Sequence, residues 1–376
     1  MTKSTAPEQT QAPAGSTQPE VLIERTGHLG RIILNRPRAI NALTAAMVSA
    51  IRGALDEWEH DDGVATVLLS GAGERGLCAG GDIVAIYRDA GNGGAASARF
   101  WAEEYELNAR ISSYPKPYVA LMDGIVLGGG VGVSAHGRHR VVTERTKVGM
   151  PETGIGFVPD VGGTYLLSRA PGELGTHAAL TAGTMTGSDA ILLGLADVYV
   201  DSSRLEELAA ALAEKPAGDV LRNFAGEAPE APLAAARHWI DECYGHDDVE
   251  SILDALLRSG EKDANSAASA VQAKSPTALK VTLQSLRRAR ALPDLKSVLT
   301  QEYRVSLHAL AAPDFAEGVR AQVIDKDRNP RWQPATLQEV RRSDVDAYFE
   351  PVRGQTDLFT PEAFATDFVT KSQEPK

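Results

Sequence analysis

The chain has 376 residues, of which 43% are hydrophobic and 23% are charged, which is typical of a soluble protein with a sizeable buried core. Its formal net charge of -12 argues against nucleic acid as the main partner, although a phosphorylated ligand needs only a local basic patch. Two cysteines, Cys78 and Cys243, are too few for a disulfide framework and indicate a reducing compartment.

Residues 1–20 are rich in Thr, Gln, Pro and Ala and lack the basic region and apolar core of a signal peptide. They contain no Arg and carry Glu8 and Glu20, unlike a mitochondrial presequence. We therefore expect a disordered tail on a cytoplasmic protein. No stretch of the chain approaches the roughly 18–20 apolar residues of a membrane span, so no membrane partner is expected.

Predicted strands and helices alternate through the first 200 residues. Helical spacing of apolar residues predicts a helix that opens at Thr44 and another over residues 97–112. Runs of β-branched and aliphatic residues predict strands at 21–25, 30–34, 64–70, 118–122, 140–143 and 147–150. This alternation implies an α/β fold.

The pattern becomes helical after about residue 205, where Ala, Leu and charged residues alternate. We place the boundary between an α/β core and a helical C-terminal part near residues 214–232. The predicted division is a tail at 1–20, a core at 21–220, a helical region at 221–350 and a polar tail at 351–376.

Glycine-rich segments follow two of the predicted strands, those at 64–70 and 118–122. Gly71–Gly76 fits G-x-G-x-x-G, but further glycines come before the next helix and the segment lies outside the first βα unit, which disfavours a dinucleotide site. Gly80-Gly81 and the glycines of 128–130 both precede a predicted helix. Such turns can aim backbone amides at a ligand and form an oxyanion hole, or they can simply allow close helix–strand packing.

The segment Pro151–Asp160 carries two acids, Glu152 and Asp160, separated by glycine, proline and apolar residues. Gly and Pro favour a looped segment that could turn both carboxyls into one pocket. Acids in an apolar lining suit general acid/base or nucleophilic chemistry. The alternative is that each acid only caps a neighbouring helix.

Other chemistries find less support in the sequence. There is no G-x-S-x-G elbow, and no residues have the spacing of zinc ligands. His136 and His139 lie beside Arg138 and Arg140 and are expected to be surface residues. No metal or redox cofactor is therefore expected.

Several segments together resemble the enoyl-CoA hydratase/isomerase (crotonase) superfamily, and within it the branch of 3-hydroxyisobutyryl-CoA hydrolases. They are Asn35-Arg-Pro37 with Asn41-Ala-Leu43, Cys78–Ile83, Asp123–Gly132, Met150–Thr153, Phe157–Gly163, Ser275-Pro-Thr277, Gln301–Arg304, Asp314–Arg320 and Asp325-Lys-Asp327. The resemblance extends from about residue 21 to 342. It implies a spiral of repeated ββα units with a helical C-terminal region, acting on an acyl-CoA thioester. Family members often form trimers or hexamers, so a homo-oligomer is possible.

The resemblance also assigns roles to individual residues. The amides of Gly81 and Gly129 would hold the thioester oxyanion, and Glu152 matches the acid shared across much of the superfamily. Asp160 stands where hydratases usually carry glycine, and an acid there resembles the hydrolases. Glu104 matches a hydrolase residue near the substrate, although it could equally be a solvated helix acid. Arg38 is a candidate contact for a CoA phosphate.

Gly132 stands where hydratases place their other catalytic glutamate, so the resemblance implies weak hydratase activity at best. The hypothesis is thioester hydrolysis at Glu152 and Asp160. Two alternatives remain open. Enoyl-CoA isomerisation needs only Glu152 and leaves Asp160 unexplained. A crotonase-fold protein could also bind acyl-CoA without turning it over.

Overall fold

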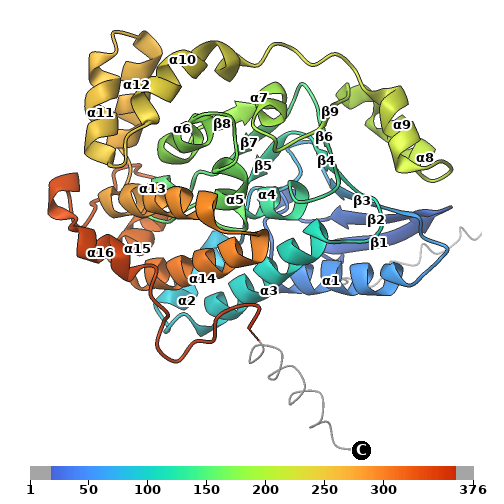
Figure 1. Ribbon diagram of the computed structural model, residues 1–376. Coiled ribbons are helices and arrows are strands. Elements are labelled where there is room, and N and C mark those ends of the chain that lie inside the picture. The colour runs from blue at the N-terminus through green and yellow to red at the C-terminus, as the bar shows by residue number, and fades with distance from the viewer. Residues whose placement is uncertain (1–17, 361–376) are drawn as a thin grey trace, which may run out of the picture.

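The computed structural model describes residues 18–360, which form two β-sheets surrounded by helices (Figure 1). The tails expected at 1–20 and 351–376 fall mainly outside this part of the chain, so that expectation lies largely beyond the described residues. Among the described residues, no helix is long and apolar enough to cross a membrane.

The larger sheet has six strands, five of them parallel. Its spatial order is β1 (Val21–Thr26), β2 (Leu29–Leu34), β3 (Thr66–Gly71), β4 (Tyr118–Met122), β6 (His139–Val142) and β9 (Val198–Tyr199). Only β1 and β2 pair antiparallel, joined by a turn at residues 27–28, as the two apolar runs predict. Each parallel step requires a crossover, and helices supply most of these crossovers.

The smaller sheet has three strands, β5 (Ile125–Leu127), β7 (Lys147–Gly149) and β8 (Thr184–Thr186). Strand β5 follows β4 after only two residues, Asp123 and Gly124, where the chain passes from one sheet to the other. Glycine is required at 124 because its φ is +65° and a Cβ would lie 2.7 Å from the Cα of Gly76. Repeated strand pairs followed by helices confirm the crotonase-type α/β fold.

The helices of the first 230 residues cover the sheets. They are α1 (Ala45–Glu59), α2 (Ile83–Ala90), α3 (Ala95–Ser112), α4 (Gly129–Ser134), α5 (Gly163–Leu167), α6 (Leu174–Thr181), α7 (Gly187–Leu192), α8 (Leu205–Leu212) and α9 (Ala217–Phe224), with short 3₁₀ turns η1 (Pro37–Ala39), η2 (Glu152–Ile155) and η3 (Ser202–Arg204). Helix α1 begins as predicted after Thr44, whose hydroxyl accepts the Met47 N–H at 3.2 Å.

The C-terminal region is helical, as predicted. It contains α10 (Pro232–Tyr244), α11 (Val249–Arg258), α12 (Lys262–Gln272), α13 (Pro276–Ala291), α14 (Leu295–Ala311), α15 (Pro313–Val319), the π-helix η4 (Arg320–Ile324), η5 (Leu337–Glu339) and α16 (Arg342–Ala347). Figure 1 shows α13 and α14 crossing in front of the core, with α14 alongside α3. The C-terminal region therefore reaches the centre of the molecule.

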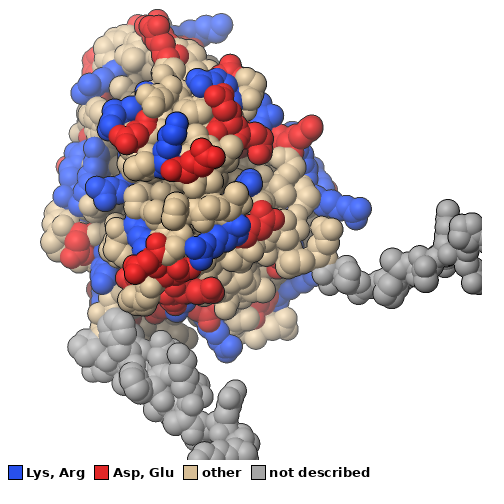
Figure 2. Space-filling model, turned by 90° about the vertical axis from the view of Figure 1, so that its right-hand side faces the viewer, with Lys and Arg blue, Asp and Glu red and all other residues tan. Residues whose placement is uncertain are grey.

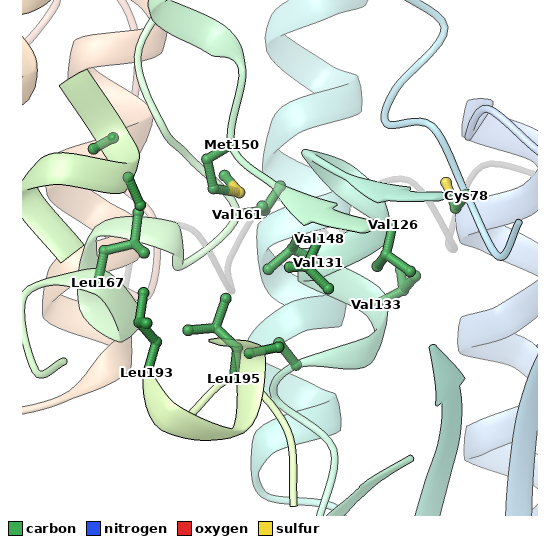
Figure 3. Close-up of a cluster of buried hydrophobic side chains, with 14 of the residues drawn as sticks. Cys78, Val126, Val131, Val133, Val148, Met150, Val161, Leu167, Leu193 and Leu195 are labelled. Carbon is green, nitrogen blue, oxygen red and sulfur yellow. The ribbon is translucent and has the colours of Figure 1, made fainter. Parts of the chain in front are cut away.

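Buried residues from both parts of the chain form one large hydrophobic cluster, and part of it is drawn in Figure 3. Helices α8 and α9 belong to a separate, smaller cluster on the larger sheet, packed against Leu29, Leu68 and Val119. An extended link over residues 225–231 then leads to α10. The helical pattern after residue 205 thus begins with two helices that cover the sheet.

The face in Figure 2 carries Lys and Arg interspersed with Asp and Glu. On this face neither sign gathers into a stripe of the kind that binds nucleic acid, consistent with the net charge.

Candidate active site

The glycine turns at residues 80–81 and 128–129, here called the two glycine turns, and the acid segment of residues 151–160 line one cavity of about 160 Å³. Its lining comes from the turn before α2, from α2 and α3, from the turn before α4, and from the segment 151–161. Five of the sequence-predicted residues lie in it: Gly81, Glu104, Gly129, Glu152 and Asp160. The sequence therefore identified most of the polar residues of this pocket.

The two glycine turns lie next to each other in the cavity lining. A Cβ on Gly129 would lie 3.3 Å from the Gly81 nitrogen and 2.6 Å from Glu104 Oε1. A Cβ on Gly128 would lie 2.8 Å from Glu152 Oε1. Gly128 also has φ +48° and ψ −117°, a conformation that is essentially restricted to glycine. Close approach to the carboxyls, as well as backbone conformation, therefore requires glycine here.

The backbone amides of Gly81 and Gly129 are available to a ligand. Gly129 is the first residue of α4, so its N–H has no partner within the helix. Across residues 18–360, no hydrogen bond within the protein involves the N–H of either Gly81 or Gly129. Two free amides at neighbouring turns are the arrangement that stabilises an oxyanion.

The two acids do not cap helices. Glu152 opens η2, whose N-cap is Pro151, and α5 has Gly162 as its N-cap, with no side-chain capping bond in either case. Both carboxyls point into the cavity and both residues are 6% exposed. The capping interpretation of this segment is therefore wrong.

Burial raises the pKa of all three acids in the pocket. It raises the pKa of Asp160 from its usual 3.8 to about 7, against the opposing effect of a hydrogen bond from the Tyr105 hydroxyl. Burial and the neighbouring Asp160 raise the pKa of Glu152 well above its usual range, and the same two causes act on Glu104. All three carboxyls therefore hold their protons to higher pH than carboxyls in water do.

Glu104 lies in the middle of α3 and is 2% exposed, so the solvated-helix interpretation of this residue is wrong. Within the described chain, Glu104 Oε1 and Glu152 Oε2 have no hydrogen-bond partner. Buried polar atoms are nearly always paired, so these two oxygens face a position that a substrate or water would fill.

Apolar and aromatic side chains form the rest of the pocket. Trp101 stacks on Phe157 with ring centroids 5.2 Å apart, and Phe157 meets the edge of Phe315 at 5.7 Å. Phe315 belongs to the C-terminal region, so that region buttresses the pocket wall. This lining explains why the carboxyls are poorly solvated.

Arg38 lies outside the cavity lining, in η1, with an exposed side chain. Its two cationic neighbours are engaged, because Arg36 pairs with Asp82 at 3.0 Å and Arg75 donates to the carbonyls of residues 37 and 38 at 2.6 Å. Arg38 has no side-chain partner in residues 18–360. Its role in binding a CoA phosphate stays a prediction.

The sequence did not identify the groups that hold Asp160. The Tyr105 hydroxyl donates to Asp160 Oδ2 at 2.6 Å and lies 2.8 Å from the hydroxyl of Ser306. Glu302 Oε2 accepts the Gly162 N–H at 2.6 Å. Glu302 and Ser306 lie four residues apart on α14, and that spacing of polar residues within an apolar helix face was the available signal.

His136 was expected at the surface, and it is only partly exposed. Its Nε2 lies 2.8 Å from the carbonyl oxygen of Val161, next to Asp160. Burial lowers its pKa to about 4, so the neutral ring donates its Nε2 proton to that carbonyl. The dinucleotide interpretation of Gly71–Gly76 also finds no support, because a Cβ on Gly76 would meet the backbone of Ile125 at 2.1 Å.

Comparison with known families matches residues 29–349 to the family described as Enoyl-CoA hydratase/isomerase. Among curated proteins, the chain is 42% identical over 350 residues to the mitochondrial 3-hydroxyisobutyryl-CoA hydrolase of Rattus norvegicus, covering 90% of each. It is 41% identical to the protein of the same name from Homo sapiens, again over 90% of each chain.

Two solved structures resemble the whole molecule. A carnitinyl-CoA dehydratase from Mycobacterium thermoresistibile is 54% identical with a TM-score of 0.87, covering 89% of this chain and 98% of the other. An enoyl-CoA hydratase from Rhodobacter sphaeroides 2.4.1 is 41% identical with a TM-score of 0.84 and the same coverage. All four proteins carry names for reactions of CoA thioesters.

Proposed function

Because the chain belongs to the enoyl-CoA hydratase/isomerase family, we propose that it is a thioester hydrolase that converts 3-hydroxyisobutyryl-CoA and water into 3-hydroxyisobutyrate and CoA. The observation that carries this proposal is the joint presence of Glu152, Asp160 and two free glycine amides in one small pocket. Mitochondrial relatives named for this reaction cover 90% of the chain.

The glycine amides stabilise the charge that develops during the reaction. The thioester carbonyl lies between the N–H groups of Gly81 and Gly129, which donate to its oxygen. As a nucleophile adds to the carbonyl carbon, negative charge grows on that oxygen and both hydrogen bonds strengthen. A preorganised donor of this kind contributes about 3–4 kcal/mol to barrier lowering.

The acids supply the nucleophile by one of two routes. In the first, the Glu152 carboxylate attacks the carbonyl carbon, CoA leaves as a thiolate, and water hydrolyses the mixed anhydride. In the second, Glu152 removes a proton from a water molecule that attacks directly. The CoA thiolate leaves readily in both, because a thiol pKa of about 8.5 demands little protonation.

Asp160 has a separate role from Glu152. It holds the attacking water or the substrate hydroxyl, and it can pass a proton because its pKa of about 7 lies close to neutrality. Burial and the neighbouring Asp160 hold the pKa of Glu152 well above its usual range, so its carboxyl must lose a proton before it acts as a nucleophile or base. The partial positive charge on the free amides of Gly81 and Gly129 favours that ionised form, whereas displacement of water by the substrate opposes it.

Hydration or dehydration of a CoA thioester is the second candidate, and the names of the solved relatives favour it. It requires a second catalytic acid, and the position of Gly132 cannot supply one. A Cβ on Gly132 would lie 2.7 Å from the Val161 Cβ and 2.9 Å from Asn108 Nδ2. Besides Glu152, the acids that line this cavity are Glu104 and Asp160, so dehydratase chemistry would depend on one of them.

The experiment is free-thiol release from 3-hydroxyisobutyryl-CoA, measured beside the hydration of crotonyl-CoA, with Asp160→Gly as the comparison. We expect rapid thiol release by the native chain and its loss in the variant. Consumption of crotonyl-CoA without thiol release would contradict the proposal and favour the hydratase. Binding of acyl-CoA without any product would favour a non-catalytic role.

A further inference from the structure

The turn that carries Asp160 has an unusual backbone. Val161 has φ +54°, in the left-handed region that β-branched residues rarely adopt, and Gly162 follows with φ +78°. Figure 3 shows the Val161 side chain among those of Val131, Val148 and Met150 in the hydrophobic cluster. The left-handed turn thus buries Val161 while its neighbour Asp160 faces the pocket. A turn of this kind persists only when its surroundings hold it.

Helix α14 holds one side of this turn through Glu302. Oε2 of Glu302 accepts the Gly162 N–H at 2.6 Å, and Oε1 accepts both the N–H and the hydroxyl of Thr164 at 2.9 and 2.5 Å. Glu302 is 1% exposed and lies about 140 residues further along the chain. Burial raises the pKa of Glu302 to about 8, and the hydrogen bonds from Gly162 and Thr164 oppose that shift.

The same helix reaches the Asp160 carboxyl itself through two hydroxyls. Ser306, one turn after Glu302 on α14, donates to the Tyr105 oxygen, since the Tyr105 proton is committed to Asp160 Oδ2. Tyr105 comes from α3 and, like Ser306, is fully buried. The hydroxyl chain favours the ionised form of Asp160, because a donor aimed at a carboxylate lowers its pKa.

We propose that Glu302 and the Tyr105–Ser306 hydroxyl pair are positioning residues for Asp160. Helix α14 of the C-terminal region therefore supplies residues that orient an active-site side chain. Glu302 fixes the conformation of the turn and so the direction of the Asp160 side chain. The hydroxyl pair fixes the orientation of the Asp160 carboxyl group. This inference rests on the proposed function, because it gives Asp160 its role in thioester hydrolysis.

Several titratable groups face Asp160 and determine how the proposal must be tested. Glu104 and Glu152 share its pocket, Tyr105 contacts it, and Glu302 lies behind its turn. His136 contacts the same turn but stays neutral, because burial lowers its pKa to about 4. Removal of the Tyr105 donor raises the pKa of Asp160. Glu302→Gln removes no donor to the Asp160 carboxyl and so does not raise that pKa, although burial raises the pKa of Glu302 itself to about 8. The two substitutions therefore have distinguishable pH profiles.

The experiment measures kcat, KM and the pH profile of thiol release from 3-hydroxyisobutyryl-CoA by the full chain and its variants. For Tyr105→Phe we expect a lower kcat, an unchanged KM, and an acid limb shifted upward by about one pH unit. Ser306→Ala should shift the limb in the same direction but less. For Glu302→Gln we expect about a 100-fold loss of kcat without an upward shift, since misplacing a catalytic group by about 1 Å has that effect.

Asp314→Asn is the matched control. Asp314 is another buried acid of the C-terminal region, 3% exposed, and it accepts from the Ser275 hydroxyl at 2.5 Å and the Gln333 N–H at 2.7 Å. Its substitution should lower the melting temperature while kcat and the pH profile stay native. A purely structural role for Glu302 would give the same result as this control and overturn the proposal.

The outcomes also separate this inference from the function on which it rests. Absence of thiol release by the native chain would refute the proposed function. Native thiol release with Tyr105→Phe and Ser306→Ala both retaining the native pH limb would refute the positioning role alone. If Glu302→Gln fails to fold, the two hydroxyl variants still decide the matter, because each removes only one hydroxyl oxygen.

Discussion

The two glycine turns and the acid segment line one pocket, but they are held in different ways. Backbone groups hold the turns, as when the Leu43 N–H donates to the Gly80 carbonyl at 2.8 Å and the Gly128 N–H to the Gly149 carbonyl at 3.2 Å. The acid segment is held by side chains from distant elements, chiefly Tyr105, His136 and Glu302.

This difference predicts how each side responds to substitution. The glycine turns should tolerate changes around them but no side chain in place of the glycines. The acid segment should be sensitive to residues far away in the sequence, because its geometry depends on packing across three helices.

Glu152→Gln should reduce kcat about 10³- to 10⁴-fold, because it removes the nucleophile or general base while keeping the shape of the side chain. Glu103→Gln is the matched control, since Glu103 is a half-buried glutamate on α3 that does not line the pocket. Thiol release from 3-hydroxyisobutyryl-CoA is the measurement. Near-native turnover by Glu152→Gln would contradict both the nucleophilic and the general-base route.

Gly129→Ala should reduce kcat about 10²- to 10³-fold, the range found when an oxyanion donor is lost. The added Cβ would lie 2.6 Å from Glu104 Oε1, so either the turn or Glu104 must move. Gly53→Ala is the control, because a Cβ there has no neighbour within 4 Å and the residue lies inside α1. The control should be neutral or slightly stabilising. Equal kinetics in both variants would contradict the oxyanion assignment.

The contrast between the two sides also explains how far the sequence could predict this molecule. Strands, helices and the glycine turns follow local rules, so periodicity and glycine spacing located them. Glu152 and Asp160 were recognisable because charge is rare in an apolar segment. The contacts of Tyr105, Ser306 and Glu302 depend on how α3 and α14 pack together, and neither periodicity nor spacing specifies that packing. The sequence therefore predicted the acids and glycines of the pocket but not the residues that contact them from α3 and α14.

Asp160→Asn should abolish hydrolysis yet stabilise the protein at pH 8. In the unfolded chain Asp160 ionises near 3.8, whereas in the folded protein its pKa is about 7. The folded state therefore binds the extra proton between these values, and stability falls as pH rises through that window. The substitution removes a penalty on the order of 1–3 kcal/mol at pH 8 and little at pH 4, since Asn still accepts from Tyr105.

Thermal melting at pH 4 and pH 8 tests this prediction, with Asp314→Asn as the control. Asp314 is also buried, but its carboxyl accepts two hydrogen bonds that an amide cannot fully replace, so its variant should be destabilised at both values. If Asp160→Asn melts at a lower temperature than the native protein at pH 8, then the ionised Asp160 carboxylate does not destabilise the folded state.

Arg38→Ala tests the periphery of the glycine side and should have the smallest effect. The exposed Arg38 guanidinium is unpaired among residues 18–360, whereas Arg36 and Arg75 are engaged in holding the same loop. If it contacts a CoA phosphate, its loss should raise KM about two- to fivefold and leave kcat unchanged, because the contact is solvent-exposed and equally strong in the ground and transition states. The difference in KM between the variant and the native protein should shrink at high salt.

The control is Arg258→Ala, on α11, which should leave KM native at every salt concentration. A fall in kcat for Arg38→Ala would instead place this loop among the elements that position the glycine turns, and the two sides of the pocket would then both depend on side chains outside it.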